Sequence, residues 1–306
     1  MKNIEKYIDP LTDFGFKRLF GSEPDKDIMI EFLNALFEGE KIIADIVYSA
    51  TEYNGEGAKE KKVLFDLTCT GKDGEKFIIE MQRTDQEFFK DRCVFYMSRL
   101  ISTQLSPGNA NCDTSLKEVY LIGIMEFQFN NINNNYLHNI ALVNTDTGKV
   151  FYKGMGYKFL ELPNFDKKEQ ELETDLDKWF YLLKNLSWLD KIPDFMDKRV
   201  FQKIFKIAEM SKMTKEEREL YHSDVKAKSD WSAGIRFAEK KAKAEGLKEG
   251  LQEGLQKGLE KGRKQGFEEG ELKKTVVIAE SLKKKGMSVQ DISEVTGLSI
   301  EDIELL

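Results

Sequence analysis

Two carboxylates stand inside a strongly hydrophobic stretch, LFDLTCTGKDGEKFIIEMQR, at residues 64–83. Asp66 lies in the first apolar run, Glu80 and Gln82 lie in the second run, and the polar segment GKDGE separates the two. If residues 72–74 form a three-residue turn, Asp66 stands directly opposite Glu80 on one face of a hairpin. A two-residue Asp-Gly turn would shift the pairing by one residue, so both registers stay open at this point.

Two carboxylates this close repel each other and are costly to bury unless a cation compensates their charge. Oxygen donors without a neighbouring His or Cys favour Mg²⁺ or Mn²⁺ over Zn²⁺. Such ions activate water and hold phosphate oxygens in phosphoryl transfer. The alternative is an edge hairpin with its polar face in water, but the run FIIEM is typical of a strand that is buried on both faces. The hairpin therefore predicts a divalent-cation site formed by Asp66 and Glu80.

The elements around the hairpin must position these acids, and their order indicates a mixed α/β fold. Apolar spacing and Gly/Pro breaks predict helices over 9–38 (as two helices), 85–105 and most of 168–240. The strands expected besides the hairpin cover 42–50, 118–129 and 138–152. This order predicts a mixed sheet with helices packed on it.

Several segments together resemble one nuclease family. Asp66, the hairpin and then Glu80-Met81-Gln82 are similar to the PD-(D/E)XK nuclease signature in its E-x-Q variant. The wider pattern resembles the recombination-promoting nuclease and transposase family of that superfamily, in the ordered segments DFGFKRLFG, FIIEMQR, FFKDRCVFYMSRLISTQL, YLIGIMEFQF and FLELPNF. The resemblance covers about residues 7–165. It implies a restriction-endonuclease-like core and a metal-dependent DNA endonuclease that promotes recombination or transposition.

The resemblance also implies roles for individual residues of the hairpin. Asp66 and Glu80 would be catalytic metal ligands for Mg²⁺ or Mn²⁺, and the main-chain carbonyl of Met81 would be a further metal ligand. Asp13 could complete the metal shell from the first helix, although an acid at that position is more often a helix cap or a partner of the helix dipole.

Gln82 stands where many nucleases of this superfamily have a lysine that orients or polarises the attacking water. Glutamine carries no charge, so Lys17, Lys62 or the metal ion would have to supply it. This departure keeps open an alternative function, a catalytically weakened protein with the nuclease fold that serves as a nucleic-acid-binding or protein-interaction module.

Arg92, Tyr96 and Arg99 share one face of the helix expected after the hairpin. They line a DNA groove in one interpretation and form a solvated flank in the other, and the resemblance favours the groove for Arg92 and Tyr96. Arg92 would then contact phosphate, with Lys17 as a second basic residue of the nucleic-acid-binding site.

Composition points to a cytoplasmic protein. The net charge of −7 argues against a general nucleic-acid coat, so DNA would be held at a local site. No apolar run is long enough for a membrane span, the first residues have no apolar signal-peptide core, and the odd set Cys69, Cys93 and Cys112 lacks metal-ligand spacing.

The chain is expected to contain four parts: a PD-(D/E)XK-like core at 1–165, a helical region at 166–240, a glycine-repeat tract at 241–271 and a small helix-turn-helix-like module at 272–306. Glycine recurs every fourth residue from Gly246 to Gly270. Helical glycines are unfavourable and the stripe rotates along a helix, so the tract is either a flexible linker or an oligomerisation helix.

The last part, SVQDISEVTGLSIEDI, resembles a helix-turn-helix with Gly297 in the turn. Its second helix would carry Glu301, Asp302 and Glu304 but no basic residue, which disfavours insertion into a DNA groove. We therefore expect a packing or self-association module, and a homo-oligomer formed through the C-terminal tail.

Overall fold

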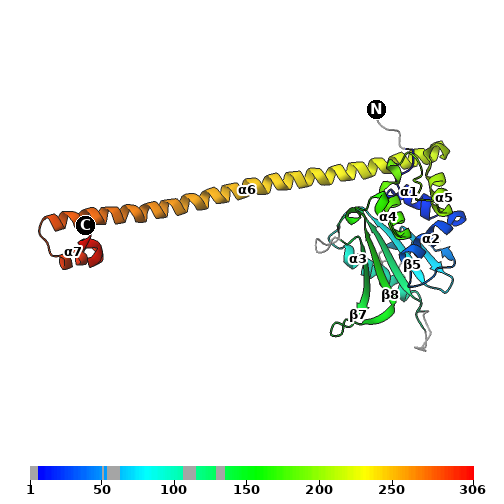
Figure 1. The fold of residues 1–306 in the computed structure, drawn as a ribbon, viewed down its shortest axis with the longest axis horizontal. Coiled ribbons are helices and arrows are strands. Elements are labelled where there is room, and N and C mark those ends of the chain that lie inside the picture. The colour runs from blue at the N-terminus through cyan, green and yellow to red at the C-terminus, as the bar shows by residue number, and fades with distance from the viewer. Residues whose placement is uncertain (1–5, 50–51, 54–62, 106–114, 129–134) are drawn as a thin grey trace. The chain divides into compact units, whose positions relative to one another are not determined.

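The computed structural model describes residues 6–49, 52–53, 63–105, 115–128 and 135–306. Lys62 and Cys112 lie outside these described residues. The chain divides into two compact units, Met1–Ser229 and Asp230–Leu306. The first unit contains the sheet and its covering helices, and the second contains most of the long helix α6 and two short C-terminal helices (Figure 1).

The strands are β1 (Ile46–Tyr48), β2 (Glu52–Tyr53), β3 (Val63–Leu64), β4 (Leu67–Gly71), β5 (Lys76–Gln82), β6 (Val119–Met125), β7 (Leu137–Val143) and β8 (Val150–Glu161). The α-helices are α1 (Asp13–Phe20), α2 (Asp27–Leu36), α3 (Phe89–Ser102), α4 (Asp175–Asn185), α5 (Arg199–Ala208), α6 (Lys215–Lys284), α7 (Val289–Thr296) and α8 (Ile300–Glu304). Short 3-10 turns cover Glu23–Asp25, Leu162–Asn164, Glu169–Glu171, Leu186–Trp188 and Met210–Lys212.

Six strands form a mixed sheet in the order β1-β4-β5-β6-β8-β7. The central pairs β5–β6 and β6–β8 are parallel, and the other pairs are antiparallel. β5 and β6 are mostly buried because helices cover both of their faces. This mixed sheet flanked by helices agrees with the α/β class expected from the sequence and is consistent with a PD-(D/E)XK core.

The hairpin β4–β5 has the register of the three-residue turn. Leu67 pairs with Ile79 and Thr70 with Lys76, which continues to Asp66 opposite Glu80. The turn closes through the N–H of Gly74, which donates to the carbonyl of Gly71 at 3.0 Å. Gly74 has a φ of +90°, a conformation that residues with a Cβ rarely adopt, so glycine sets this turn.

The expected strand over residues 63–70 is interrupted in the structure. β3 pairs with β2, whereas β4 pairs with β1 and β5, and Phe65 and Asp66 lie in the break between them. Asp66 therefore stands just outside the regular ladder, where its backbone and side chain are free to bond elsewhere.

The two faces of the sheet belong to different hydrophobic clusters. Phe77 and Ile79 pack with α1, α2, α4 and α5, whereas Ile78 packs with α3 on the other face. Figure 1 shows α3 on one side of the sheet and α2 on the other. Because side chains alternate along a strand, Glu80 and Gln82 share the α3 face with Ile78.

The helices after residue 165 complete the core of the first unit. Trp179 of α4 is buried, and its ring lies 5.9 Å from Phe20, 5.4 Å from Phe32 and 5.2 Å from Phe201. The chain on both sides of residue 165 packs into one core, and the first compact unit runs to Ser229.

Residues 138–152 are a hairpin instead of the single expected strand. β7 and β8 pair antiparallel and are joined by a turn in which the side chain of Asn144 accepts hydrogen bonds from the N–H groups of Asp146 and Thr147. Gly148 completes the turn with a φ of +68°. β8 then continues to Glu161, so it includes much of the segment FLELPNF.

Helix α6 runs without interruption through the glycine tract and carries all seven glycines. α7 and α8 follow, and Ile292 and Ile303 pack with Ala279 of α6 in a small cluster. Gly297 ends α7 with a φ of +74°, which is the turn position expected for it. Among the helices that the structure describes, none combines the length and the apolar character needed to cross a membrane.

Candidate active site

Asp66 and Glu80 lie together where the β4–β5 ladder ends. The Oδ2 atom of Asp66 accepts a hydrogen bond of 2.7 Å from the backbone N–H of Met81. The Oε1 atom of Glu80 accepts a longer hydrogen bond, 3.3 Å, from the backbone N–H of Asp66. Each carboxylate is thus fixed by the backbone of the opposite strand, and Glu80 is only 8% exposed.

The position of this pair makes its negative charge unfavourable. Burial raises the pKa of Asp66 above its ordinary value, and the charge of Asp13 adds to the effect. Burial and then the charge of Asp66 raise the pKa of Glu80 to about 8. A cation beside the pair would reverse both effects, because it stabilises the ionised carboxylates.

The donor atoms around the pair suit a small divalent cation. All are oxygens, which is the donor type that Mg²⁺ and Mn²⁺ prefer. The N–H and carbonyl of one strand residue point to the same side, so the carbonyl of Met81 faces the side that Asp66 occupies. Within the described part of the chain, no group of three or more His, Cys, Asp or Glu side chains is placed to hold a metal ion. The pair would therefore bind an ion together with the Met81 carbonyl and water.

Gln82 is bound at both ends of its side-chain amide. Its Nε2 atom donates to the carbonyl of Thr84 at 2.9 Å, and its Oε1 atom accepts a hydrogen bond from Arg92 of α3. Arg92 also donates to the side chain of Gln86. The charge of Arg92 lowers the pKa of Glu80, so the guanidinium acts electrostatically on the carboxylate pair. The structure therefore brings Arg92 and Gln82 together at this site, a contact that helical spacing alone did not predict.

Tyr96 lies one turn further along α3. Its ring meets the ring of Phe65 edge to face at 4.9 Å, and the Arg92 guanidinium lies 6.0 Å from its centre. Burial, and next the charge of Glu80, raise the pKa of Tyr96. Arg99, the third residue of the expected helix face, is half-buried like Arg92 and Tyr96. The face of α3 that Arg92, Tyr96 and Arg99 share thus starts beside the carboxylate pair at Arg92 and runs away from it toward Arg99.

Lys17 of α1 acts electrostatically on Asp66. Lys17 forms an ion pair with Asp13 at 2.8 Å. The charge of Asp13 raises the pKa of Asp66, and the charge of Lys17 lowers it. The side chain of Thr12 caps α1, and Asp13 is an acid in the first turn, the position of a partner of the helix dipole. Asp13 and Lys17 also line a cavity of about 880 Å³ between α1 and the first turns of α6.

A second charged cluster at the same end of the sheet was not expected from the sequence. Lys228 of α6 contacts Asp9 at 3.0 Å and Glu126 at 2.8 Å. Glu126 follows the last residue of β6, and its N–H donates to the carbonyl of Gln82 at 3.0 Å. Acids that follow neighbouring parallel strands meet at one sheet edge, so the position of Glu126 after YLIGIM was a usable signal. No pattern in the sequence predicts that Lys228 lies in this cluster.

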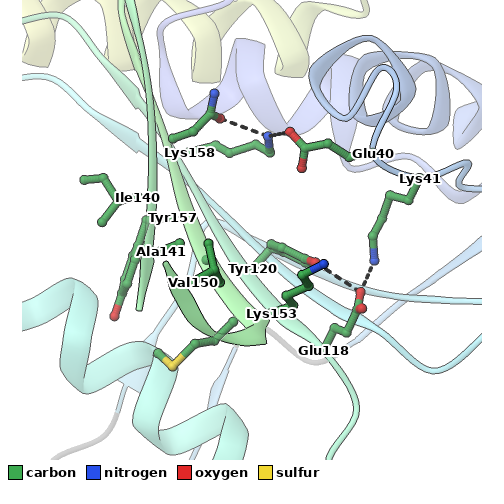
Figure 2. Close-up of a pocket in the computed structure, with 13 residues that line it drawn as sticks. Glu40, Lys41, Glu118, Tyr120, Ile140, Ala141, Val150, Lys153, Tyr157 and Lys158 are labelled. Carbon is green, nitrogen blue, oxygen red and sulfur yellow. Dashed lines mark hydrogen bonds and ion pairs between the residues drawn. The ribbon is translucent and has the colours of Figure 1, made fainter. Parts of the chain in front are cut away.

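The cavity drawn in Figure 2 is a different place. It measures about 430 Å³ and is lined by residues of β6, β7, β8 and the segment after α2. Lys158 pairs with Glu40 at 2.7 Å, and Glu118 lies between Lys41 and Tyr120. None of the site residues expected from the sequence lines this cavity. The larger cavity of about 880 Å³, lined by Asp13 and Lys17, lies nearer the carboxylate pair.

A mixed sheet that carries an Asp/Glu pair at the end of a central hairpin, with a basic helix beside it, is consistent with a protein of the nuclease class. The family model described as PD-(D/E)XK nuclease family transposase matches residues 10–238. This match covers most of the chain, and the chain belongs to that family. No curated protein and no solved structure matches it. The family match extends to the start of α6, as the first compact unit does.

Proposed function

We propose that this protein is a metal-dependent DNA endonuclease that hydrolyses phosphodiester bonds at the Asp66–Glu80 pair. The observation that carries the proposal is the pairing of two buried carboxylates, each bonded to the backbone of the other strand, with raised pKa values. Family membership supports nuclease chemistry in general. The metal, the endonuclease activity and the roles of single residues are the proposal.

Asp66, Glu80 and the Met81 carbonyl would hold Mg²⁺ or Mn²⁺. A bound divalent ion supplies an activated water and neutralises charge on the phosphate. The protein holds Asp66 and Glu80 ready for this through two backbone hydrogen bonds, which limit the motion of the carboxylates. Burial of Glu80 keeps bulk water from screening the site.

Arg92 takes the place of the lysine that the E-x-Q sequence lacks. Gln82 accepts a hydrogen bond from its guanidinium and so places a fixed positive charge beside Glu80. A guanidinium also binds two phosphate oxygens at once, which suits a scissile phosphate. Lys17 and Tyr96 would contact the DNA on the α1 side and the α3 side of the pair.

The second candidate function is a nucleic-acid-binding or protein-interaction module with weakened or no turnover. One observation favours it: both ends of the Gln82 amide are occupied by Thr84 and Arg92, so Gln82 has little capacity left to orient a water. The two candidates differ in cleavage, and only the nucleic-acid-binding form of the second shares DNA binding with the first.

Plasmid nicking with Mg²⁺ or Mn²⁺ separates them. Wild type is expected to convert supercoiled DNA to nicked and linear forms, and Asp66→Asn and Glu80→Gln are expected to lose about 10²-fold or more of that rate. Glu118→Gln is the matched control, because this acid lies in the other cavity and should leave the rate unchanged. Cleavage that persists in both site variants would remove the activity from this pair. DNA binding without cleavage in wild type would establish the second candidate.

The broken DNA ends produced by such an enzyme would promote recombination or transposition. We further propose that copies of the chain associate through the helical tail, which would bring two nuclease units to one DNA. The cytoplasmic location stays a prediction from composition.

A further inference from the structure

The middle of α6 carries an apolar row that nothing in the described chain covers. Its members, which we call the leucine row, are 60–75% exposed: Leu247, Leu251, Leu255, Leu259 and Phe267. Burying a leucine side chain stabilises a protein by about 2 kcal/mol relative to leaving it in water. A regular series of exposed leucines along one helix therefore indicates a surface that a partner covers.

The glycines beside this row have no role within the chain. A Cβ added at any position from Gly246 to Gly270 in the repeat would meet no atom within 4 Å. Each helical glycine costs about 1 kcal/mol relative to alanine. Glycine does, however, let a second backbone approach closely, as in small-xxx-small helix pairs. The glycine row is thus a groove beside the leucine row.

The four-residue spacing determines how such a surface packs. Rows of side chains four residues apart are inclined to the helix axis, and two helices that interdigitate these rows cross at about −50°. The contact is then short and centred on one crossing point, which agrees with the rotation of the stripe along the helix. A long parallel coiled coil would instead need a repeat of 3.5 residues.

The order of charges along α6 indicates that the partner is a second copy of this helix and that the two helices run antiparallel. The residues that precede the first five glycines of the repeat form a third row, which we call the charged row: Glu245, Glu249, Glu253, Lys257 and Lys261. Its sign changes once, near residue 255. The charged row flanks the glycine groove on the side opposite the leucine row, because successive helical residues are about 100° apart.

In an antiparallel pair related by a two-fold axis, each row meets the same row of the other helix in reverse order. Glu249 then faces Lys261 and Glu253 faces Lys257, so both contacts are attractive, while Glu245 faces the uncharged Gln265. Glu253 and Lys257 already lie 2.5 Å apart within one helix, so two copies would form a cluster of alternating charges. In a parallel pair the charged row would face leucines.

We propose that two copies of this chain associate antiparallel through residues 246–262 of α6, with the helices crossing near Gly254 and Leu255. The inference deepens the proposed self-association through the tail and does not depend on nuclease activity. The surface is isologous, so it closes with two copies and leaves no free face for a third.

Sedimentation equilibrium of the full-length chain tests the association. Wild type is expected to be a dimer, and Leu251→Asp combined with Leu255→Asp is expected to be a monomer. Gly254→Leu should also abolish the dimer while raising helicity in circular dichroism, so that its effect cannot come from unfolding. A wild type that is monomeric up to 100 µM (about the highest concentration practical in the assay), or that forms trimers, would overturn the proposal.

A charge exchange tests the direction. The variant Glu249→Lys/Glu253→Lys leaves Glu245 as the one acid of the charged row, and Lys257→Glu/Lys261→Glu has a row without bases. Each alone should self-associate at least tenfold more weakly than wild type, and a mixture of the two should form heterodimers. Lys248→Glu/Glu260→Lys, on the opposite side of the helix, is the matched control and should dimerise normally. Equal self-association of both row variants and wild type would exclude the antiparallel arrangement and leave the nuclease proposal untouched.

Discussion

Glu80 has a charge that the folded protein disfavours in the absence of a cation. Its pKa is raised from 4.5 to about 8, so the folded state holds this proton more tightly than the unfolded chain does. The stabilisation that the protonated Glu80 gives to the folded state is therefore complete below pH 4.5 and is lost as the pH rises through about 8. Asp66 changes in the same direction and adds to the effect.

Glu80→Gln removes the disfavoured charge and keeps an oxygen for the Asp66 N–H. With a metal chelator present, we expect this variant to exceed wild type by about 2 kcal/mol in free energy of unfolding at pH 8, and by much less at pH 5. Urea unfolding at the two pH values measures this. A Glu80→Gln variant that is destabilised equally at both would show that the carboxylate makes a favourable contact instead.

Arg92 and Gln82 should act as one unit in catalysis. Arg92→Ala is expected to lower the nicking rate by about 10²-fold, because it removes the positive charge beside the pair. Gln82→Ala should lower it less, and the double variant should be no slower than Arg92→Ala alone. Steady-state nicking rates measure all three. Additive losses would mean that Gln82 has a role of its own, as a water-orienting residue would.

At the scale of elements, the site depends on contacts that tie helices to the end of the sheet. Arg18 of α1 pairs with Glu217 of α6 at 2.5 Å, and Arg83 after β5 lies 3.4 Å from Asp224 of α6. Lys228 joins α6 to Glu126 after β6. The first turns of α6 are thus part of the nuclease unit, which agrees with the extent of the family match.

Lys228→Met should destabilise the nuclease unit by about 1 kcal/mol, because it removes the cation that pairs with the half-buried carboxylates of Glu126 and Asp9. Lys226→Met is the matched control, since Lys226 is exposed two residues away on the same helix. Denaturant midpoints of the full-length chain give the comparison. Equal midpoints for the two variants would show that Lys228 adds nothing to the attachment of α6.

Local rules predicted the hairpin and reduced its register to two alternatives, of which the structure has the three-residue turn. The Lys-Asp-Gly turn and the alternation of β5 are both contained in the short segment that forms them, so the opposition of Asp66 and Glu80 could be inferred. The break at Asp66 could not, because it arises from the change of partner between β3 and β4. Asn144 and Gly148 are residue types that often form turns, so the sequence contained a signal for the turn between β7 and β8. The expectation of a single strand over 138–152 did not take this signal into account.

Contacts between distant segments could not be predicted from the sequence. The bond between Gln82 and Arg92 depends on the angle at which α3 crosses the sheet, and the position of Lys228 depends on where α6 begins to pack. Helical spacing placed Arg92 and Tyr96 on one face but did not give their partners. The residues that complete the site are therefore the ones that tertiary packing brings in.

At the scale of the whole molecule, the chain combines a nuclease unit with a tail that is costly as a lone helix. Seven glycines add about 7 kcal/mol of unfavourable helix propensity, which nothing in the described chain offsets. We therefore expect hydrogen exchange at residues 246–262 to be fast in dilute solution and to slow at concentrations where dimers form. Residues 119–125 of β6 serve as an internal control. Protection of the tract that is the same at every concentration would argue against a stabilising second copy.

Binding of Mn²⁺ to the full-length protein, followed by electron paramagnetic resonance, tests most directly whether the buried Asp66–Glu80 pair is a metal centre. Wild type and the control Glu118→Gln should each bind one more Mn²⁺ ion than Asp66→Asn or Glu80→Gln, and Mg²⁺ should compete for that ion. Equal Mn²⁺ binding by wild type and both site variants would contradict the assignment of the cation to these two carboxylates.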